Sequence, residues 1–303
     1  MTEFKSRFNA AMKSFGRLLW RALKKIGKFF KMVFENKQAA AGMIIMFFFL
    51  FMLVVLTQAL PYDATPDPYN LLAKPSWAHP FGTDELGRDL MRRLIAGSSS
   101  VLGIAFLTGL FTVTIGVVLG LISGLAGGIT DKIIMTVTNL VMTVPTFPIM
   151  LVLAQVATIT NVAVFSLILS ALSWAGLCRA VRSQIISVKE RDFIQICKVM
   201  NLRKTHIIFS ELLPNILSYV VVNFIMIMRN AITASVGIMM LGVVAYDHTN
   251  WGAILNSSQA YIMNPNAIFF WLMPVLFIAL FQAGVTLLAN GLDVVLNPRL
   301  RKN

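Results

Sequence analysis

Charged side chains are scarce in this sequence. Asp, Glu, Lys and Arg make up 13% of its 303 residues, about half of their usual share in a soluble domain. Hydrophobic residues make up 57%, and the mean hydropathy is +0.76. This composition excludes a soluble enzyme of ordinary type and a disordered chain, and it predicts an all-α integral membrane protein with several spans.

Patterns that would hold a metal, a nucleotide or a catalytic nucleophile are also missing. The two cysteines, Cys178 and Cys197, form no CxxC or CxxH pattern, and only three scattered histidines are present. The P-loop pattern GxxxxGKS/T, GxSxG and HExxH do not occur. We therefore expect no metal site, no cofactor bound by this chain and no catalytic residues.

Acidic residues are nearly absent from the apolar segments. The one exception is Asp293, at the end of the last segment. A proton-coupled carrier usually needs an acidic or histidine relay inside the membrane. If the chain transports a solute, its energy should therefore come from a partner.

Uncharged runs predict six transmembrane helices, because a bilayer core about 30 Å thick needs about 20 apolar residues in a helix. The run from Ile133 to Cys178 would be about 70 Å long as one helix, so it must fold into two spans. The polar patch 158–161 is the expected hairpin. The predicted segments are a first helix at 39–60, an extracytoplasmic loop at 61–99, and a five-helix core at 100–293 with spans near 100–124, 133–157, 162–178, 214–243 and 268–292.

The distribution of Lys and Arg predicts the topology. Of the 26 basic residues, 21 lie in 1–38, in 179–211, at Lys132 or in the tail 294–303. Basic loops stay on the cytoplasmic side, so both termini are expected there. The net charge of +13 thus reflects membrane insertion rather than nucleic-acid binding. Residues 1–38 are either an amphipathic helix on the inner lipid leaflet or a basic tail that helps to set topology.

The longest internal basic segment, 179–213, suggests two short helices joined by a turn. Apolar residues at 193, 194, 197 and 200 share one helical face. The spacing of Ser187 and Glu190 is typical of a capping box, Asn201 should end the first helix, and a second should run from about 203 to Pro214. The segment either docks into a groove on another protein or packs on the membrane surface.

Four motifs give the sequence a family resemblance. The start Arg191-Asp192-Phe193-Ile194 and the end Leu213-Pro214-Asn215 resemble the coupling loop of permease subunits of binding-protein-dependent ABC importers. Residues 81–89, FGTDELGRD, resemble the FGTDxxGRD signature of the C-type subunit in the dipeptide, oligopeptide and nickel branch. Residues 250–255 and 290–301 are similar to two further elements of that branch.

This resemblance implies the MetI-like permease fold and a set of partners. These are a homologous B-type permease, two ABC ATPases that use ATP and Mg, and an extracytoplasmic substrate-binding protein. Peptides are the commonest cargo of the branch, while nickel chelates, glutathione and oligosaccharides use similar permeases. A self-contained secondary transporter is the alternative outside the family. The ATPase contact would be made by Glu190, Arg191, Asp192, Phe193, Ile194, Cys197 and Asn201.

The sequence departs from the family pattern at several positions. Asn201 stands at the turn glycine, Ile196 at a usually small residue and Arg203 at a usual helix cap. In the fifth span, Ala234 lies near the place where the family often has an acid. The family's solute therefore does not transfer to this chain.

Arg229 is the one charge in the middle of a span, so it should face the protein interior. It either pairs with the partner permease or lines the pathway and holds a carboxylate of the cargo. The pathway residues we expect are Asn223, Arg229, Asn230 and Thr233.

Three further local predictions concern helix ends and packing. Thr83 could cap a helix at the outer motif, Gly116, Gly120 and Gly124 permit close helix contact, and Pro145 with Pro148 favours a kink. The outer motif, expected near the outer gate, comprises Phe81, Gly82, Thr83, Asp84, Gly87, Arg88 and Asp89.

Overall fold

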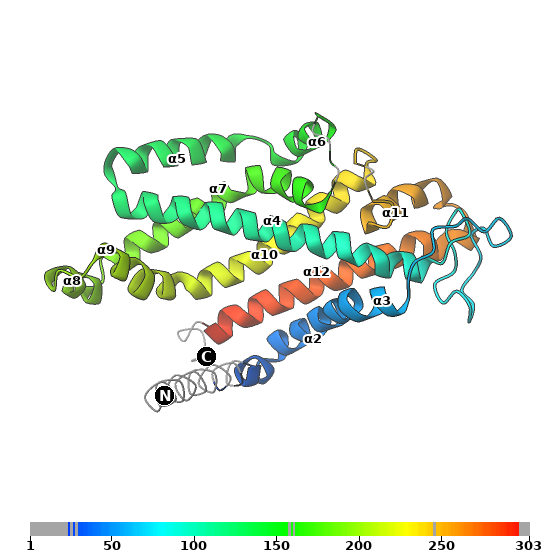
Figure 1. Cartoon of the computed structure of the whole chain (residues 1–303), viewed down its shortest axis with the longest axis horizontal. Coiled ribbons are helices and arrows are strands. Elements are labelled where there is room, and N and C mark those ends of the chain that lie inside the picture. Colours follow the sequence, from blue (N-terminus) through cyan, green and yellow to red (C-terminus); the bar gives the residue numbers. More distant parts are fainter. Residues whose placement is uncertain are drawn as a thin grey trace, which may run out of the picture.

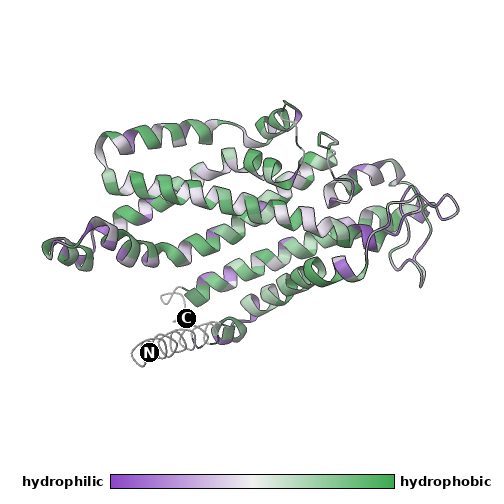
Figure 2. Ribbon diagram, in the orientation of Figure 1, coloured by the Kyte–Doolittle hydropathy of each residue, from purple (hydrophilic) through white to green (hydrophobic). Residues whose placement is uncertain are grey.

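The computed structural model describes Lys24, Gly27, residues 30–156, Ile159, 161–244 and 247–296. In this described part the regular structure is helical, and the remainder is loop with one isolated bridge between Thr83 and Asp89. Long helices run side by side along the molecule (Figure 1). Most of their residues are apolar, and hydrophilic residues are more frequent toward the two ends (Figure 2). The predicted all-α membrane fold is confirmed.

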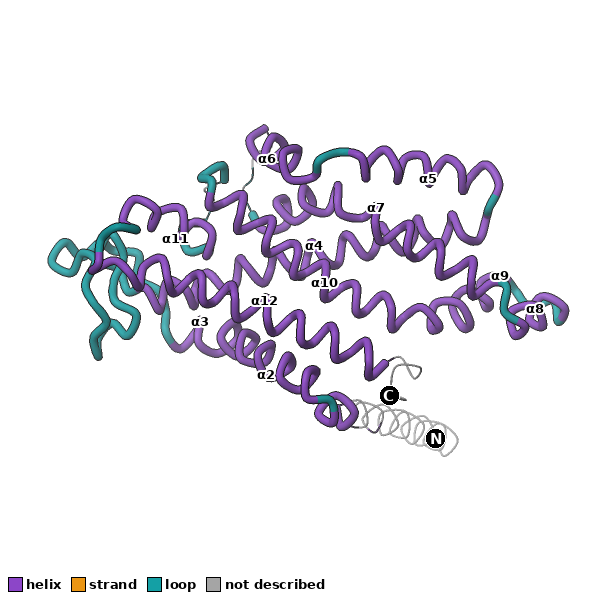
Figure 3. Tube along the Cα trace, turned by 180° about the vertical axis from the view of Figure 1, so that it is seen from behind, coloured by secondary structure: helices purple, strands orange, loops and turns teal. Residues whose placement is uncertain are grey.

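Among the described residues, five straight helices are long and apolar enough to cross a membrane, and a bent pair of helices would make a sixth span. Loops concentrate at the ends of this bundle, as Figure 3 shows from behind. The first crossing joins α2 (Lys37–Phe51), a π-helical turn (Met52–Leu56) and α3 (Thr57–Ala59). The others are α4 (Leu90–Ala126), α5 (Gly128–Thr143) with α6 (Thr146–Val156), α7 (Val162–Lys189), α10 (Leu213–Met240) with the turn before it, and α12 (Ile268–Leu296).

The prediction placed the second span at 100–124, but α4 begins ten residues earlier, at Leu90. Its 37 residues would measure about 55 Å, which is more than a bilayer core requires. Arg92 and Arg93 lie in its first turn, so counting uncharged residues missed the part of the helix that carries them.

The third crossing is broken rather than kinked. Helices α5 and α6 meet at 87° across Val144 and Pro145. Val144 is extended (φ −74°, ψ 129°), as expected for a residue that precedes proline. Pro148 lies in the first turn of α6, where a proline removes no helical hydrogen bond. Helix α6 ends at Val156, and α7 begins at Val162 with Asn161 as its cap. The predicted hairpin at 158–161 falls between these two helix ends, and residues 158 and 160 lie outside the described residues.

Glycines bring α4 and α7 into close contact. A Cβ atom added at Gly116 would lie 3.1 Å from the side chain of Leu177, and one at Gly120 would lie 2.8 Å from the carbonyl oxygen of Cys178. Gly124 meets Ile185 in the same way. The predicted close packing is confirmed. Helices α2 and α12 use the same device at Gly42 and Gly291, against the backbone of the other helix.

The remaining core lies where α2, α4, α11 (Trp251–Ser258) and α12 meet. Phe49, Trp251 and Phe281 are fully buried there, with aromatic ring centroids 5.2–5.8 Å apart. The indole Nε1 of Trp251 donates to the carbonyl oxygen of Leu94 at 2.9 Å. Most of the amphipathic segment predicted at 1–38 lies outside the described residues, but Asn36 caps α2.

Replacing Gly120 by alanine should destabilise the protein by about 1–3 kcal/mol, because the new methyl group would overlap the Cys178 carbonyl. Gly176→Ala on α7 is the matched control, since its Cβ would meet no atom within 4 Å. Thermal unfolding of the purified protein in detergent should give a lower Tm for Gly120→Ala and an unchanged or higher Tm for Gly176→Ala. Equal Tm values would contradict the close helix contact.

Candidate coupling loop and translocation face

The basic segment at one end of the bundle forms a helix, a turn and the start of the next long helix. Helix α7 continues to Lys189, so Ser187 lies inside it and the predicted capping box is wrong. Helix α8 (Asp192–Val199) follows, as predicted. Asn201 then adopts a left-handed conformation with φ +52°. Asparagine tolerates this region better than most residues, which explains how it can replace the glycine of the related loops.

The second short helix expected at 203–213 is not separate. Helix α9 (Lys204–His206) leads into a π-helical turn (Ile207–Leu212) and then directly into α10. Pro214 therefore lies within a continuous helix rather than at a junction. Because the π-helical turn precedes it, the missing N–H of Pro214 causes no break here.

The side chains of α8 divide into an anchoring face and an exposed face. Ile194 is 1% exposed and packs with Leu212 and Ile216, and Phe193 packs against the same cluster. Cys197 is half-buried, while Glu190, Arg191 and Asp192 are exposed. Of the predicted ATPase contacts, Ile194 thus holds α8 on the bundle instead of facing outward.

Three exposed apolar residues on α8 and just after it were not among the predicted contacts. Ile196 is 57% exposed, Val199 is 87% exposed and Met200 is 67% exposed. We call these three the α8 patch. Their spacing at i, i+3 and i+4 puts them on one side of the helix. Helical spacing in the sequence groups Met200 with residues 193, 194 and 197 on one apolar face, but Met200 is exposed while Ile194 is buried.

Helix α10 carries the predicted pathway residues on its least covered side. Asn230 and Thr233 are exposed, and Asn223 and Arg229 are half-buried. In the most apolar stretch of this span, only 11% is buried within the described chain, which is the lowest share among the five straight spans. A polar side chain facing lipid is costly, so this side must meet a partner or a water-filled path.

Arg229 has a neutral partner on α12. Its Nε donates to Oε1 of Gln282 at 3.0 Å, and Nε2 of Gln282 donates to the hydroxyl of Thr233 at 2.7 Å. In the described part of the chain no ion pair includes Arg229. Gln282 therefore fixes the guanidinium without neutralising it. Gln282 was not predicted, because the order of residues does not show that α12 lies beside Arg229.

At the opposite end of the bundle, the outer motif forms a folded loop. Gly82 and Gly87 have φ of +76° and +79°, and a Cβ at Gly87 would collide with the carbonyl of Asp67. Asp67 itself accepts hydrogen bonds from the side chain of Asn70 and the N–H of Tyr69, which lower the pKa of its carboxyl group. Phe81 packs edge-on against Phe277 of α12 at 6.1 Å.

Thr83 does not cap a helix, contrary to the prediction. Its hydroxyl accepts a hydrogen bond from the N–H of Ala73 at 2.8 Å and donates one to the carbonyl of Asn70. It therefore links two segments of the loop. The cap of α4 is Asp89, which accepts from the N–H of Arg92 at 2.8 Å and also contacts His79. The residues of the motif before Asp89 form the loop, so the helix begins at Leu90.

Asp84 is the centre of the outer motif. It is fully buried and accepts hydrogen bonds from Nε of Arg88 at 2.8 Å and from Nη1 of Arg93 at 2.7 Å. Arg93 is only 1% exposed and also donates to the carbonyl of His248. The motif is therefore an ion-pair network that ties the outer loop to α4 and to the segment before α11. The role of Arg93 was not predicted.

These features are those of a helical membrane protein with several spans, and similarity to known proteins shows its family. Residues 116–302 match the model of the binding-protein-dependent transport system inner membrane component. The match covers more than half of the chain, so the chain belongs to this family. It is a permease subunit of an ABC importer and a multi-pass protein of the inner membrane.

Relatives of this chain carry names from peptide transport. The dipeptide transport system permease protein DppC of Alkalihalophilus pseudofirmus is 31% identical over 277 residues, which cover 90% of this chain and 89% of that protein. The oligopeptide transport system permease protein OppC of Haemophilus influenzae is 29% identical over 293 residues, covering 94% and 90%. DppC of Bacillus subtilis is 29% identical over 289 residues, covering 93% and 85%. The predicted C-type peptide permease family is thereby confirmed.

Asp84→Asn should destabilise the protein by about 3–5 kcal/mol, because it leaves Arg93 buried without its carboxylate. Glu85→Gln is the control. Its ion pairs are longer, at 3.4 and 3.5 Å, and it is partly exposed, so the loss should be about 1 kcal/mol or less. Thermal unfolding in detergent measures both, and a larger loss for Glu85→Gln would contradict the central role of Asp84.

Proposed function

We propose that this chain imports di- and oligopeptides together with a homologous B-type permease, two ABC ATPases and an extracytoplasmic substrate-binding protein. The names of the relatives support the peptide cargo. In this proposal the partner ATPases use ATP and Mg, and the chain itself binds no cofactor and catalyses no reaction. Both termini and α8 lie on the cytoplasmic side, as the Lys and Arg distribution favours.

The single observation that carries the coupling role is the α8 patch. Ile196, Val199 and Met200 are exposed beyond the long spans, beside the charged residues Glu190, Arg191 and Asp192. An apolar side of a short helix with charges beside it suits a groove on a partner protein. ATP-driven closure of the ATPases would move α8, and the continuous helix from Ile207 to Met240 would carry that movement to the pathway residues.

Val199→Asp should abolish coupling between ATP hydrolysis and uptake. The added carboxylate would have to be buried, without a partner, in the groove that receives the α8 patch. The assembled transporter should retain basal ATPase activity but lose at least about 90% of peptide uptake, an effect of about 1.4 kcal/mol or more. Uptake by membrane vesicles and ATP hydrolysis should be measured on the same preparation.

Two controls accompany this variant. Ser187→Asp adds the same charge at an exposed position of α7 and should leave uptake unchanged. Ile194→Asp introduces a charge into a buried site, so it should reduce the amount of folded protein instead. Normal coupled uptake by Val199→Asp would refute the assignment of the α8 patch.

Arg229 serves either the partner permease or the cargo, and two variants separate these roles. Arg229→Ala removes the charge, while Arg229→Lys keeps the charge but loses the planar donor that binds Gln282. Loss of the B-type subunit on copurification of Arg229→Ala would assign the charge to the permease interface. An intact complex with uptake lowered at least about tenfold, and partly restored by lysine, would assign it to the carboxylate of the cargo. Normal assembly and uptake in Arg229→Ala would contradict both roles.

A further inference from the structure

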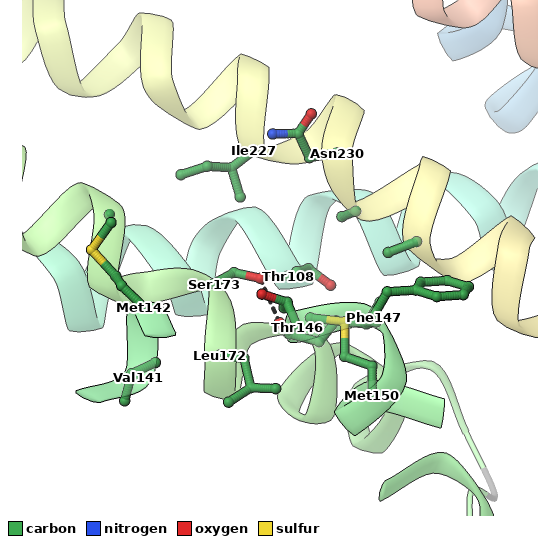
Figure 4. A pocket seen from close by; sticks show the side chains of 14 residues that line it. Thr108, Val141, Met142, Thr146, Phe147, Met150, Leu172, Ser173, Ile227 and Asn230 are labelled. Carbon is green, nitrogen blue, oxygen red and sulfur yellow. Dashed lines mark hydrogen bonds between the residues drawn. The ribbon is translucent and has the colours of Figure 1, made fainter. Parts of the chain in front are cut away.

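A cavity of about 410 Å³ lies between α4, the bent pair α5–α6, α7 and α10. Figure 4 shows α10 on one side of it, with Ile227 and Asn230, and α6 on the other, with Thr146, Phe147 and Met150. Its volume falls within the range of about 300–1,000 Å³ that is usual for ligand sites. The roles assigned so far to α8 and Arg229 do not account for this cavity.

Thr108 of α4 supplies a buried hydroxyl group to the cavity. The residue is 1% exposed, and within the described part of the chain its Oγ1 has no hydrogen-bond partner. A threonine in a membrane helix commonly donates to the carbonyl four residues earlier. No such bond is present at Thr108, and the nearby Ser166 hydroxyl of α7 lies 3.3 Å from the Ile104 carbonyl while it donates at 2.7 Å to the carbonyl of Val162. A buried hydroxyl without a partner is rare, so this one points to a group that binds in the cavity.

The other polar groups around the cavity are neutral. Asn230 of α10, Thr146 of α6 and Ser173 of α7 line it, and among the described residues no ionisable side chain does. Asparagine amides and threonine hydroxyls can each donate and accept a hydrogen bond. They are complementary to a peptide group, which offers one N–H and one carbonyl oxygen, rather than to a charged terminus.

The apolar walls of the cavity are adaptable. Met142, Phe147, Met150 and Leu172 contribute them. Methionine is flexible and polarisable, and it is common on surfaces that accept ligands of varied shape. Such walls allow different side chains to pass beside the same hydrogen-bonding groups.

We propose that this cavity binds the uncharged backbone of a peptide in transit, with Thr108 and Asn230 as its hydrogen-bonding groups. The proposal rests on the proposed peptide import. It assigns the cavity to peptide groups that every cargo shares, so recognition there does not depend on the sequence of the peptide.

Thr108→Val tests this site, because valine has nearly the same shape but no hydroxyl. The matched control is Thr112→Val, one turn further along α4. Thr112 is also fully buried and without a partner, but it does not line the cavity. Uptake of radiolabelled tri-alanine should be measured in vesicles that contain the transporter assembled with its own partner subunits.

We expect Thr108→Val to raise the KM for tri-alanine about two- to tenfold, the effect of one lost hydrogen bond, while assembly stays normal. Thr112→Val should behave as wild type. As a second measurement, a tripeptide with a photoreactive diazirine side chain should crosslink to Thr146–Met150 or Leu169–Gly176 in wild type and in Thr112→Val, and less in Thr108→Val.

Each contrary result has a distinct meaning. If the wild-type transporter imports tri-alanine and Thr108→Val imports it with the same KM, the cavity is not the binding site, while peptide import still stands. Loss of the B-type subunit in Thr108→Val would show that a partner side chain, and not cargo, fills the cavity. If the wild-type transporter imports neither tri-alanine nor longer peptides, the proposed function itself fails.

Discussion

The hydrocarbon core of a membrane offers no hydrogen bonds, and this constraint decides most of the structure. Polar side chains on the spans generally bond within their own helix, as Thr114 does to Leu110 and Ser173 does to Leu169. A polar group that the chain leaves incomplete is a candidate contact for another molecule. Arg229, with a neutral partner only, and Thr108 and Thr112, with none in the described chain, are exceptions, and of these two threonines Thr108 alone lines the cavity.

Packing separates a tightly joined part of the bundle from a looser one. Glycine contacts hold α4 against α7 and α2 against α12, and these helices share little room for rearrangement. Helix α10 is the least covered straight span, and it faces the cavity below the bend of α5–α6. Because α10 continues unbroken from the π-helical turn after α9, the displacement proposed at α8 would act on one continuous helix that carries the proposed pathway residues at 223–233. A joint at Pro214, as the sequence suggested, would have absorbed part of that displacement.

The sequence predicted what depends on local chemistry and missed what depends on neighbours. Charge spacing located the spans, and the turn at Asn201 followed from the left-handed conformation that asparagine accepts. The position of Ile194 could not be predicted, because an apolar residue on a short helix fits an anchoring face and a docking face equally well. Arg93 was equally hidden, since only the folded loop brings Asp84 to it.

One departure from the family acquires a physical meaning once the cavity is known. The resemblance places an acid, in many relatives, near the position of Ala234, and Ala234 lines the cavity here. A carboxylate at that position would add a charge to a space whose other polar groups are hydroxyls and an amide. Alanine at this position keeps the described lining of the cavity neutral. The charge and the neutral amide are carried by two adjacent residues of α10: Arg229 bonds to Gln282 of α12, and Asn230 lines the cavity.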